Sequence, residues 1–301
     1  MTLSMPPLHE SRKRLALGTA QFGLDYGIAN QQGQVPDDAA RAIVDHASAH
    51  GIDTLDTAIA YGDSEKRLGE IGVRNWRVVS KLPAADEGCA DLLRWVQDSV
   101  DTSLERLNVT RLYGLLLHRP HQLLEPGGDR LFAALQQLKC RGVVEKVGVS
   151  IYDPAELDLI CERYPLDMVQ APFNIMDSRL IESGWLSRLS EQGTELHVRS
   201  AFLQGLLLME AGTRPEKFGR WEKKWRCWDE WLRESELTPL QACIGYVLGF
   251  PQIDRVVIGV DSLAQLTEIL HSLGAPPSGI PSELFACDPV LVNPSRWSEL
   301  G

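Results

Sequence analysis

The chain has 301 residues, of which 44% are hydrophobic and 24% charged, a composition typical of a globular protein with enough residues for a large core. Its 41 acidic and 30 basic residues give a formal net charge of −11. A surface of that sign repels phosphate backbones and anionic lipids, so the composition argues against nucleic-acid and membrane partners.

The N-terminal segment and the cysteines together predict a cytoplasmic protein. Residues 1–11 include Pro6 and Pro7 and precede a basic patch, whereas a secretory signal runs from basic to apolar residues. No apolar stretch approaches ~20 residues, so no transmembrane helix is expected. The six cysteines are scattered without a CxxC pair or a zinc spacing, so we expect free thiols and no metal site.

Short apolar runs alternate with longer helical segments along most of the chain. Most of these runs lack a polar alternation, as is typical of parallel strands covered on both faces. Strands are predicted at residues 14–18, 53–57, 77–82, 112–118, 146–151, 167–172, 195–200 and 255–260. Helices are predicted at residues 37–50, 90–107, 131–140, 154–162, 181–192, 239–248 and 263–273. Two have clear start signals, namely Pro36 for the first and Asp153 as the N-cap of the fourth.

Eight strands that alternate with helices predict either a closed barrel or an open doubly wound sheet. The first strand-to-helix turn reads GTAQFG at residues 18–23, without the GxGxxG pattern of an open dinucleotide-binding sheet. The sequence therefore favours an α/β fold of the (β/α)8 TIM-barrel type, as a single domain over residues 1–301. The charged segment 210–235 is predicted to be a helical insertion between strands seven and eight, and residues 281–301 an irregular tail.

Four tryptophans in the insertion, Trp221, Trp225, Trp228 and Trp231, are spaced to form one stripe along a helix. Two interpretations are open. The stripe either packs on the barrel, which is usual for an apolar helix face, or lines a substrate pocket. The first interpretation is favoured.

Polar side chains end three consecutive predicted strands, at the edge where parallel barrels hold their active sites. Asp56 is followed by Tyr61 after the second strand, Lys81 ends the third and His118 the fourth. A carboxylate can hold an ammonium in place, and a nearby ammonium stabilises a phenolate. Each residue alone has a structural explanation as a cap or a packing group. Together they predict a tyrosine suited to protonate a carbonyl oxygen, with the histidine either orienting the carbonyl or relaying a proton.

The motifs LGTAQFG, IDTLDTAIAYGDSEKRLGE, VVSKL, LLLHRP, VGVS, VQAPFN and VVIGV resemble those of the aldo-keto reductases, over about residues 14–273. The resemblance implies that Tyr61 is the general acid, that Lys81 and Asp56 tune it, and that His118 binds the carbonyl oxygen. It also implies a small-molecule carbonyl substrate and a nicotinamide dinucleotide extended across the barrel mouth.

The resemblance further implies a set of cofactor contacts. Ser150 and Gln170 match positions that hold the nicotinamide carboxamide, although Ile151 replaces the asparagine that usually follows that serine. Arg199 stands where the family often has tyrosine, and is a candidate to contact phosphate or a substrate anion. The other implied cofactor contacts lie after strands one, seven and eight: Gly18, Thr19, Ala20, Ser200, Phe202, Gln204, Gly205, Gly259, Asp261, Ser262, Gln265 and Glu268.

The residues after the last strand bear on the choice between NADP and NAD. Family members that prefer NADPH usually have Lys or Arg near positions 259–261 and at 265, because these side chains bind the adenosine 2′-phosphate. This chain has Asp261 and Gln265 there. NADP is the default cofactor of the family, but these two residues make NAD nearly as strong a candidate.

The sequence thus predicts an NAD(P)H-dependent oxidoreductase that reduces an aldehyde or ketone to an alcohol. The alternative is a catalytically weak or inactive dinucleotide-binding barrel that acts as a sensor or partner subunit, which the departures at Ile151, Arg199 and Asp261 keep open. A metal-dependent barrel hydrolase is disfavoured, because the strand ends lack His/Asp ligand sets. The substrate and the oligomeric state are left open.

Overall fold

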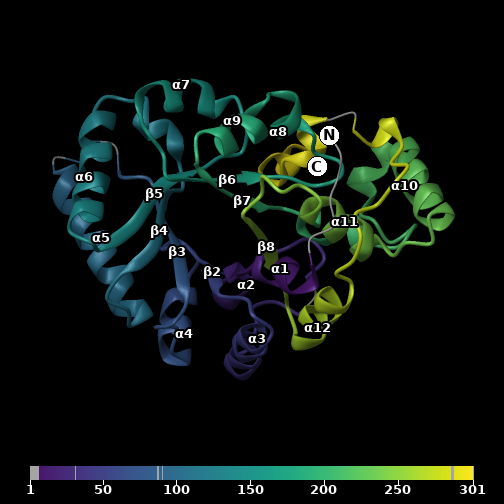
Figure 1. The fold of residues 1–301 in the computed structure, drawn as a ribbon, viewed down its shortest axis with the longest axis horizontal. Helices are drawn as coiled ribbons and strands as arrows, with labels where there is room; N and C mark the ends of the chain where they lie inside the picture. The colour runs from purple at the N-terminus through teal and green to yellow at the C-terminus, as the bar shows by residue number, and fades with distance from the viewer. Residues whose placement is uncertain (1–6, 31, 87, 90, 286–287, 301) are drawn as a thin grey trace.

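A computed structural model of the chain describes residues 7–30, 32–86, 88–89, 91–285 and 288–300. Eight parallel strands close into a barrel in chain order, which confirms the predicted fold class (Figure 1). They are β1 (Leu15–Gly18), β2 (Thr54–Asp56), β3 (Arg77–Leu82), β4 (Leu112–Leu117), β5 (Val144–Ser150), β6 (Met168–Pro172), β7 (Glu195–Arg199) and β8 (Arg255–Gly259).

Helices surround the barrel and connect its strands (Figure 1). The longer ones are α3 (Asp37–Ala49), α4 (Ser64–Ile71), α5 (Leu92–Leu107), α6 (Gly128–Cys140), α7 (Glu156–Arg163), α9 (Trp185–Glu191), α10 (Glu222–Glu234), α11 (Pro239–Leu248) and α12 (Leu263–His271). The shorter ones are α1 (Leu8–Lys13), α2 (Ala20–Gly23), α8 (Arg179–Glu182) and α13 (Pro289–Val292), with 3-10 segments η1 (Pro120–Leu123), η2 (Leu203–Leu208), η3 (Glu216–Trp221), η4 (Ser282–Leu284) and η5 (Pro294–Leu300).

The helices differ from the sequence predictions in several places. The structure has a helix, α4, between β2 and β3, where none was predicted. The predicted helix 181–192 is two helices, because Gly184 adopts a φ of 77° between α8 and α9. The fourth predicted helix begins at Glu156, since the Asp153 side chain accepts a hydrogen bond from the Ala155 amide one turn before α7. The predicted start of α5 at Ala90 lies outside the described residues.

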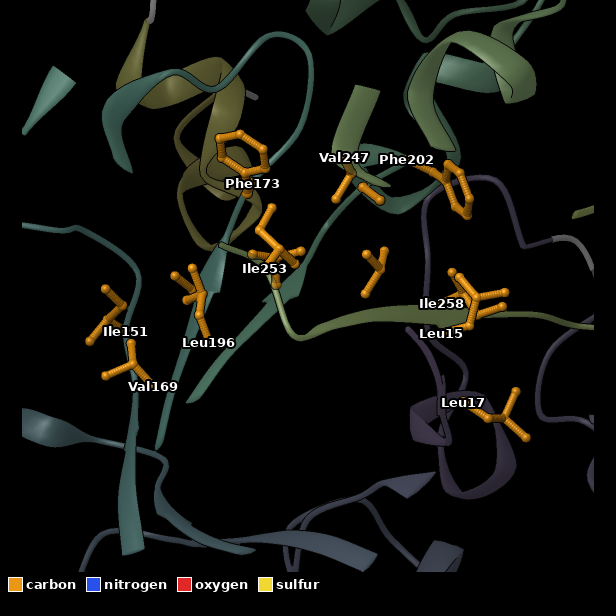
Figure 2. Close-up of a cluster of buried hydrophobic side chains, with 14 of the residues drawn as sticks. Leu15, Leu17, Ile151, Val169, Phe173, Leu196, Phe202, Val247, Ile253 and Ile258 are labelled. Carbon is orange, nitrogen blue, oxygen red and sulfur yellow. The ribbon is translucent and has the colours of Figure 1, made fainter. Parts of the chain in front are cut away.

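Side chains along each strand alternate between the helix layer and the barrel axis. Those that face the helices belong to one large buried cluster, part of which is shown in Figure 2 with side chains from β1, β6, β7 and β8. Inside the barrel, Val79, Leu116 and Met168 form a separate small cluster. Each of these three lies two residues before a polar residue, Lys81, His118 or Gln170. Apolar side chains therefore fill the barrel beneath the polar groups at its C-terminal end.

Arg14, just before β1, holds the barrel closed. Its guanidinium donates to the carbonyl oxygens of Leu248 at 2.7 Å, Phe250 at 2.6 Å and Ile253 at 3.0 Å. These carbonyls lie at the end of α11 and in the turn that leads to β8. The residue that precedes the first strand is thus tied to the segment that precedes the last one, beside the β1–β8 pairing.

The insertion after β7 contains η3 and α10, and its tryptophan stripe faces inward. Trp225, Trp228 and Trp231 are 5%, 0% and 5% exposed. The tail packs against this insertion, since the Trp221 indole donates to Asp288 at 3.0 Å. The tail is more regular than predicted, because it folds into η4, α13 and η5. Within the described residues, no helix has the length and apolarity needed to cross a bilayer.

Candidate active site

The C-terminal ends of β2, β3 and β4 bring Asp56, Lys81 and His118 to Tyr61. Lys81 Nζ donates to Asp56 Oδ2 at 2.7 Å and to the Thr57 carbonyl at 2.9 Å. It also lies 4.9 Å from the centre of the Tyr61 ring. The rings of Tyr61 and His118 meet edge to face with centres 5.9 Å apart. The structure thus assembles the four residues that the sequence predicted as a group.

The ion pair between Lys81 and Asp56 is almost fully buried, with side chains 1% and 6% exposed. Burial by itself lowers the pKa of an ammonium, but the Asp56 carboxylate and the Tyr61 phenol outweigh it here. The pKa of Lys81 is therefore raised above its ordinary value. Lys81 stays protonated at physiological pH and keeps a positive charge beside the Tyr61 ring.

Asp56 is held from its other side by β6, across the barrel interior. Gln170 Nε2 donates to Asp56 Oδ1 at 2.6 Å, and Ser150 Oγ donates to Gln170 Oε1 at 3.4 Å. Both carboxylate oxygens therefore have a donor. The sequence had predicted Ser150 and Gln170 as cofactor contacts, and it missed that their side chains position Asp56.

His118 is neutral at physiological pH. Burial, followed by the positive charges of Lys81 and Arg199, lowers its pKa to about 4. A neutral imidazole carries one N–H donor and one acceptor nitrogen. His118 therefore offers a hydrogen-bond donor beside Tyr61 without adding a third positive charge.

The lowered pKa of His118 predicts a pH-dependent stability. Between pH 4 and about 6.5, the ordinary histidine pKa, the unfolded chain binds a proton at this residue that the folded protein does not. The resulting stabilisation is present above about pH 6.5 and is lost as the pH falls towards 4. Between pH 7 and pH 4, we expect the free energy of unfolding of His118→Gln to fall by about 2 kcal/mol less than that of the wild type. Urea unfolding at pH 7, 5.5 and 4 measures the difference.

The matched control for this measurement is His9→Gln, which removes an exposed histidine on α1. It is expected to follow the wild-type pH dependence. An unchanged dependence in His118→Gln would contradict the lowered pKa of His118.

Two glycines let the loop that carries Tyr61 pack against α2. A Cβ at Gly23 would lie 1.8 Å from the Tyr61 carbonyl oxygen, and one at Gly62 would lie 2.3 Å from the Gly23 carbonyl oxygen. Ser64, at the start of α4, ties the same loop to β1 by donating to the Thr19 carbonyl at 2.9 Å. Close backbone contact therefore fixes where Tyr61 stands.

A pocket of about 350 Å³ opens at this end of the barrel, and Asp56 and Tyr61 form part of its wall. Most of the predicted cofactor contacts line it: Gly18, Thr19, Ala20, Arg199, Ser200, Phe202, Gln204, Gly205, Gly259, Asp261, Gln265 and Glu268. Ser150, Gln170 and Ser262 are not among its lining residues. Ser262 instead caps α12 by accepting a hydrogen bond from the Gln265 amide at 3.3 Å.

The loops after β1 and β7 supply lining residues that the cofactor prediction did not include: Gln21, Tyr26, Gly27, Ala29, Asn30, Ala201, Leu208 and Met209. Leu240, Val257 and Ile269 complete the wall. None of the four stripe tryptophans of the insertion lines it. The stripe is buried, as the packing interpretation predicts, but α10 packs mainly against η3 and the tail segment η4 rather than against the barrel strands. The apolar residues among those from the two loops carry no signal in the sequence, because the loop paths alone bring them to the pocket.

The loop after β7 contains an unusual run of left-handed backbone. Ser200, Leu203 and Gln204 have φ values of 64°, 49° and 54°, which residues with a side chain rarely adopt. The loop after β1 lies against it, since a Cβ at Gly205 would come 2.5 Å from the Ala29 Cβ. Such strain persists only where surrounding contacts impose it, and it is common at ligand sites.

The pocket fits an extended polar ligand such as a nicotinamide dinucleotide. Gly259 forms part of its wall and lets the Gln21 side chain pack against the backbone, since a Cβ there would come 2.5 Å from Gln21 Nε2. In the same pocket wall, Asp261 Oδ1 is buried without a hydrogen-bond donor among the described residues. A buried acceptor without a donor is a feature that a ribose hydroxyl or a carboxamide N–H can use. By contrast, no group of three His, Cys, Asp or Glu side chains in the described ranges is arranged to hold a metal ion.

Fold and site together define a TIM barrel with an Asp, Tyr, Lys and His group at its C-terminal mouth. The model of the aldo/keto reductase family matches residues 14–277. The chain therefore belongs to the aldo/keto reductase family, whose members are NAD(P)H-dependent oxidoreductases.

Individual relatives are distant. Aldo-keto reductase YhdN of Bacillus subtilis (strain 168) is 27% identical over 182 residues, which are 56% of this chain and 53% of that protein. The match thus spans about half the length of this curated relative. Aldo-keto reductase AKR11C1 from Bacillus halodurans, in its holo form, superposes with a TM-score of 0.72 at 21% identity, covering 90% of each chain.

The glycerol dehydrogenase AKR11B4 from Gluconobacter oxydans superposes with a TM-score of 0.69 at 23% identity, covering 92% of this chain and 91% of that one. At these identities the two structural likenesses support the fold alone.

Proposed function

We propose that this protein reduces an aldehyde or ketone to an alcohol with a reduced nicotinamide dinucleotide, and that Tyr61 is the general acid. The observation that carries the proposal is the buried Lys81–Asp56 pair beside the Tyr61 ring at the pocket wall. When bound, the dinucleotide supplies the hydride that reduces the carbonyl carbon. Tyr61 donates its phenolic proton to the carbonyl oxygen, and the Lys81 ammonium stabilises the phenolate that remains.

The other residues of the group orient Tyr61 and Lys81. Asp56 keeps Lys81 beside Tyr61, and Gln170 keeps Asp56 in place. Neutral His118 has an N–H available to the carbonyl oxygen, which would hold the oxygen near the Tyr61 hydroxyl and stabilise the negative charge that develops on it. Tyr61 regains its proton from solvent after the alcohol leaves.

The dinucleotide would lie along the pocket, with its pyrophosphate at the loop after β7. Left-handed residues in such a loop turn backbone N–H groups towards one side, which suits an anion. Gly18, Thr19 and Ala20 would lie under the nicotinamide, and the residues after β8 would hold the adenosine. The assignment of Ser150 and Gln170 to the carboxamide, and of Ser262 to the adenosine end, stays a prediction.

We further propose that NADH is preferred to NADPH. Asp261 and Glu268 line the adenosine end of the pocket, and Arg199 is the only Lys or Arg among the described residues that line the pocket at all. Burial, together with the nearby carboxylate of Asp25, raises the pKa of Asp261 from its low ordinary value. An ionised Asp261 repels a 2′-phosphate but accepts a hydrogen bond from a ribose hydroxyl.

Replacing Asp261 tests this preference. We expect Asp261→Ser to lower the Kd of NADPH at least about tenfold and to raise the Kd of NADH several-fold, because one repulsion and one acceptor are lost together. Fluorescence titration of both nucleotides measures the two constants. Asp38→Ser, which removes an equal charge from an exposed site on α3, is the control. A wild-type protein that binds NADPH more tightly than NADH would contradict the proposal.

Turnover separates the proposed enzyme from the alternative of a dinucleotide-binding sensor or partner subunit. The enzyme oxidises bound NADH when an aldehyde or ketone is added, and the loss of absorbance at the reduced nicotinamide band reports the rate. Tight nucleotide binding without turnover over a broad panel of aldehydes and ketones would favour the sensor.

A further inference from the structure

Arg199 is a cation at the pocket wall, at the end of β7. Its guanidinium donates to the Ile151 carbonyl at 3.0 Å and to Ser200 Oγ at 3.4 Å. It also stacks over the Tyr152 ring at 4.5 Å. These contacts hold the side chain in one orientation and engage two of its N–H groups, so other donors of the planar fork remain free for a ligand.

Arg199 has no acidic partner in the part of the chain that the structure describes. Its hydrogen bonds go to a backbone carbonyl and a hydroxyl, and neither carries a charge. By contrast, Arg179 and Arg214, whose side chains are 12% and 8% exposed, each pair with an aspartate. A partly buried guanidinium without a counter-charge is costly, and an anionic ligand removes that cost.

The Arg199 guanidinium reaches the C-terminal end of β5. Ile151, its hydrogen-bond acceptor, directly follows β5, which pairs with β4, the strand that precedes His118. The Arg199 charge contributes to the lowered pKa of His118, and both Arg199 and Tyr61 influence the pKa of Tyr26. Arg199 and Tyr61 line the same pocket, so Arg199 can meet a substrate whose carbonyl group lies at Tyr61 and His118.

We propose that Arg199 binds a carboxylate of the substrate, so that the protein reduces aldehydes or ketones that carry an acid group. A planar guanidinium matches a carboxylate with two parallel hydrogen bonds. The overall charge of −11 does not exclude such a substrate. Salt screens the repulsion from charges more than about 8 Å away at physiological ionic strength, whereas the Arg199 charge acts in direct contact with the carboxylate. The carboxylate itself takes no part in the reaction.

This inference rests on the proposed function, and matched substrate pairs test it. The pairs are butanal with 4-oxobutanoate, and benzaldehyde with 4-carboxybenzaldehyde, each at saturating NADH. We expect the wild type to prefer the acid member at least about tenfold in kcat/KM. Arg199→Gln is expected to raise KM for the acid members about 10- to 100-fold, while KM for the neutral members and the Kd of NADH stay within threefold. The KM of Arg199→Lys for the acid members is expected to lie between the values of the wild type and of Arg199→Gln.

Arg119→Gln is the matched control. Arg119 also lowers the pKa of His118, but it is exposed and does not line the pocket. It should keep the wild-type preference. An Arg199→Gln variant that loses activity equally on acid and neutral substrates, or that binds NADH more weakly, would overturn the proposal and assign Arg199 to the cofactor.

A separate measurement distinguishes failure of this inference from failure of the proposed function. If the wild type turns over neither member of a pair, the proposed function fails, and calorimetric titration with butanoate and benzoate then examines the anion site alone. Binding to the NADH-loaded wild type that is lost in Arg199→Gln supports the carboxylate site. No binding to the wild type overturns it.

Discussion

The Tyr61→Phe variant is expected to lose about 10³-fold or more in kcat while its Kd for NADH stays within about threefold. The substitution removes the only atom of the side chain that can give a proton to the carbonyl oxygen. The ring that packs against Lys81 and His118 stays in place. Steady-state rates and fluorescence titration of NADH on the same preparation measure the two quantities.

Tyr164→Phe is the matched control for this variant. Tyr164 is a buried tyrosine whose hydroxyl donates to Asp129 at 2.7 Å, and it stands at the end of α7 and does not line the pocket. It should keep kcat and lose only a little stability. Wild-type turnover in Tyr61→Phe would remove Tyr61 from the reaction and with it the proposed mechanism.

The second large effect is expected from Lys81→Met. This change leaves the Asp56 carboxylate buried without its positive partner, which typically costs about 3–5 kcal/mol of folding stability. Urea unfolding at pH 7 measures the loss. We also expect turnover to fall at least about 10²-fold, because the phenolate of Tyr61 loses its stabilising charge.

A double variant separates the charge effect from a general packing defect. Asp56→Asn removes the unpaired charge, and the new amide oxygen can still accept from Gln170. The Asp56→Asn, Lys81→Met protein should therefore be more stable than Lys81→Met alone, while it remains inactive. A double variant no more stable than Lys81→Met would mean that lost packing, and not an uncompensated charge, dominates.

Much of the barrel could be predicted because its signals are local. Apolar runs without alternation mark strands that are covered on both faces, and their polar last residues mark the C-terminal mouth. Asp56, Lys81 and His118 come from neighbouring strands, so their convergence follows once the barrel is assumed. The helix α4 was not predicted, although Gly72, at φ 97°, marks its end. The apolar residues before Gly72 have helical spacing over only a single turn, which is too short a pattern to indicate a helix.

The rest of the site depends on contacts that no local pattern reveals. Gln170 reaches Asp56 across the barrel interior, between strands that are not neighbours and residues 114 positions apart. The left-handed backbone at Leu203 and Gln204 has no glycine signal of its own, since tertiary contacts impose it on ordinary residues. The pocket wall from the loops after β1 and β7 follows from those same contacts.

The closure of the barrel by Arg14 has a consequence for how the protein is made. Arg14 and Ile253 are 239 positions apart, and β1 finds its partner β8 only after nearly the whole chain has been synthesised. At about 5–20 residues per second, a ribosome needs roughly 12–50 s to cover that interval. Throughout it, one side of β1 is an open strand edge, the kind of surface to which other chains add. The nascent protein therefore passes through a long interval in which protection by a chaperone matters more than it does for the finished barrel.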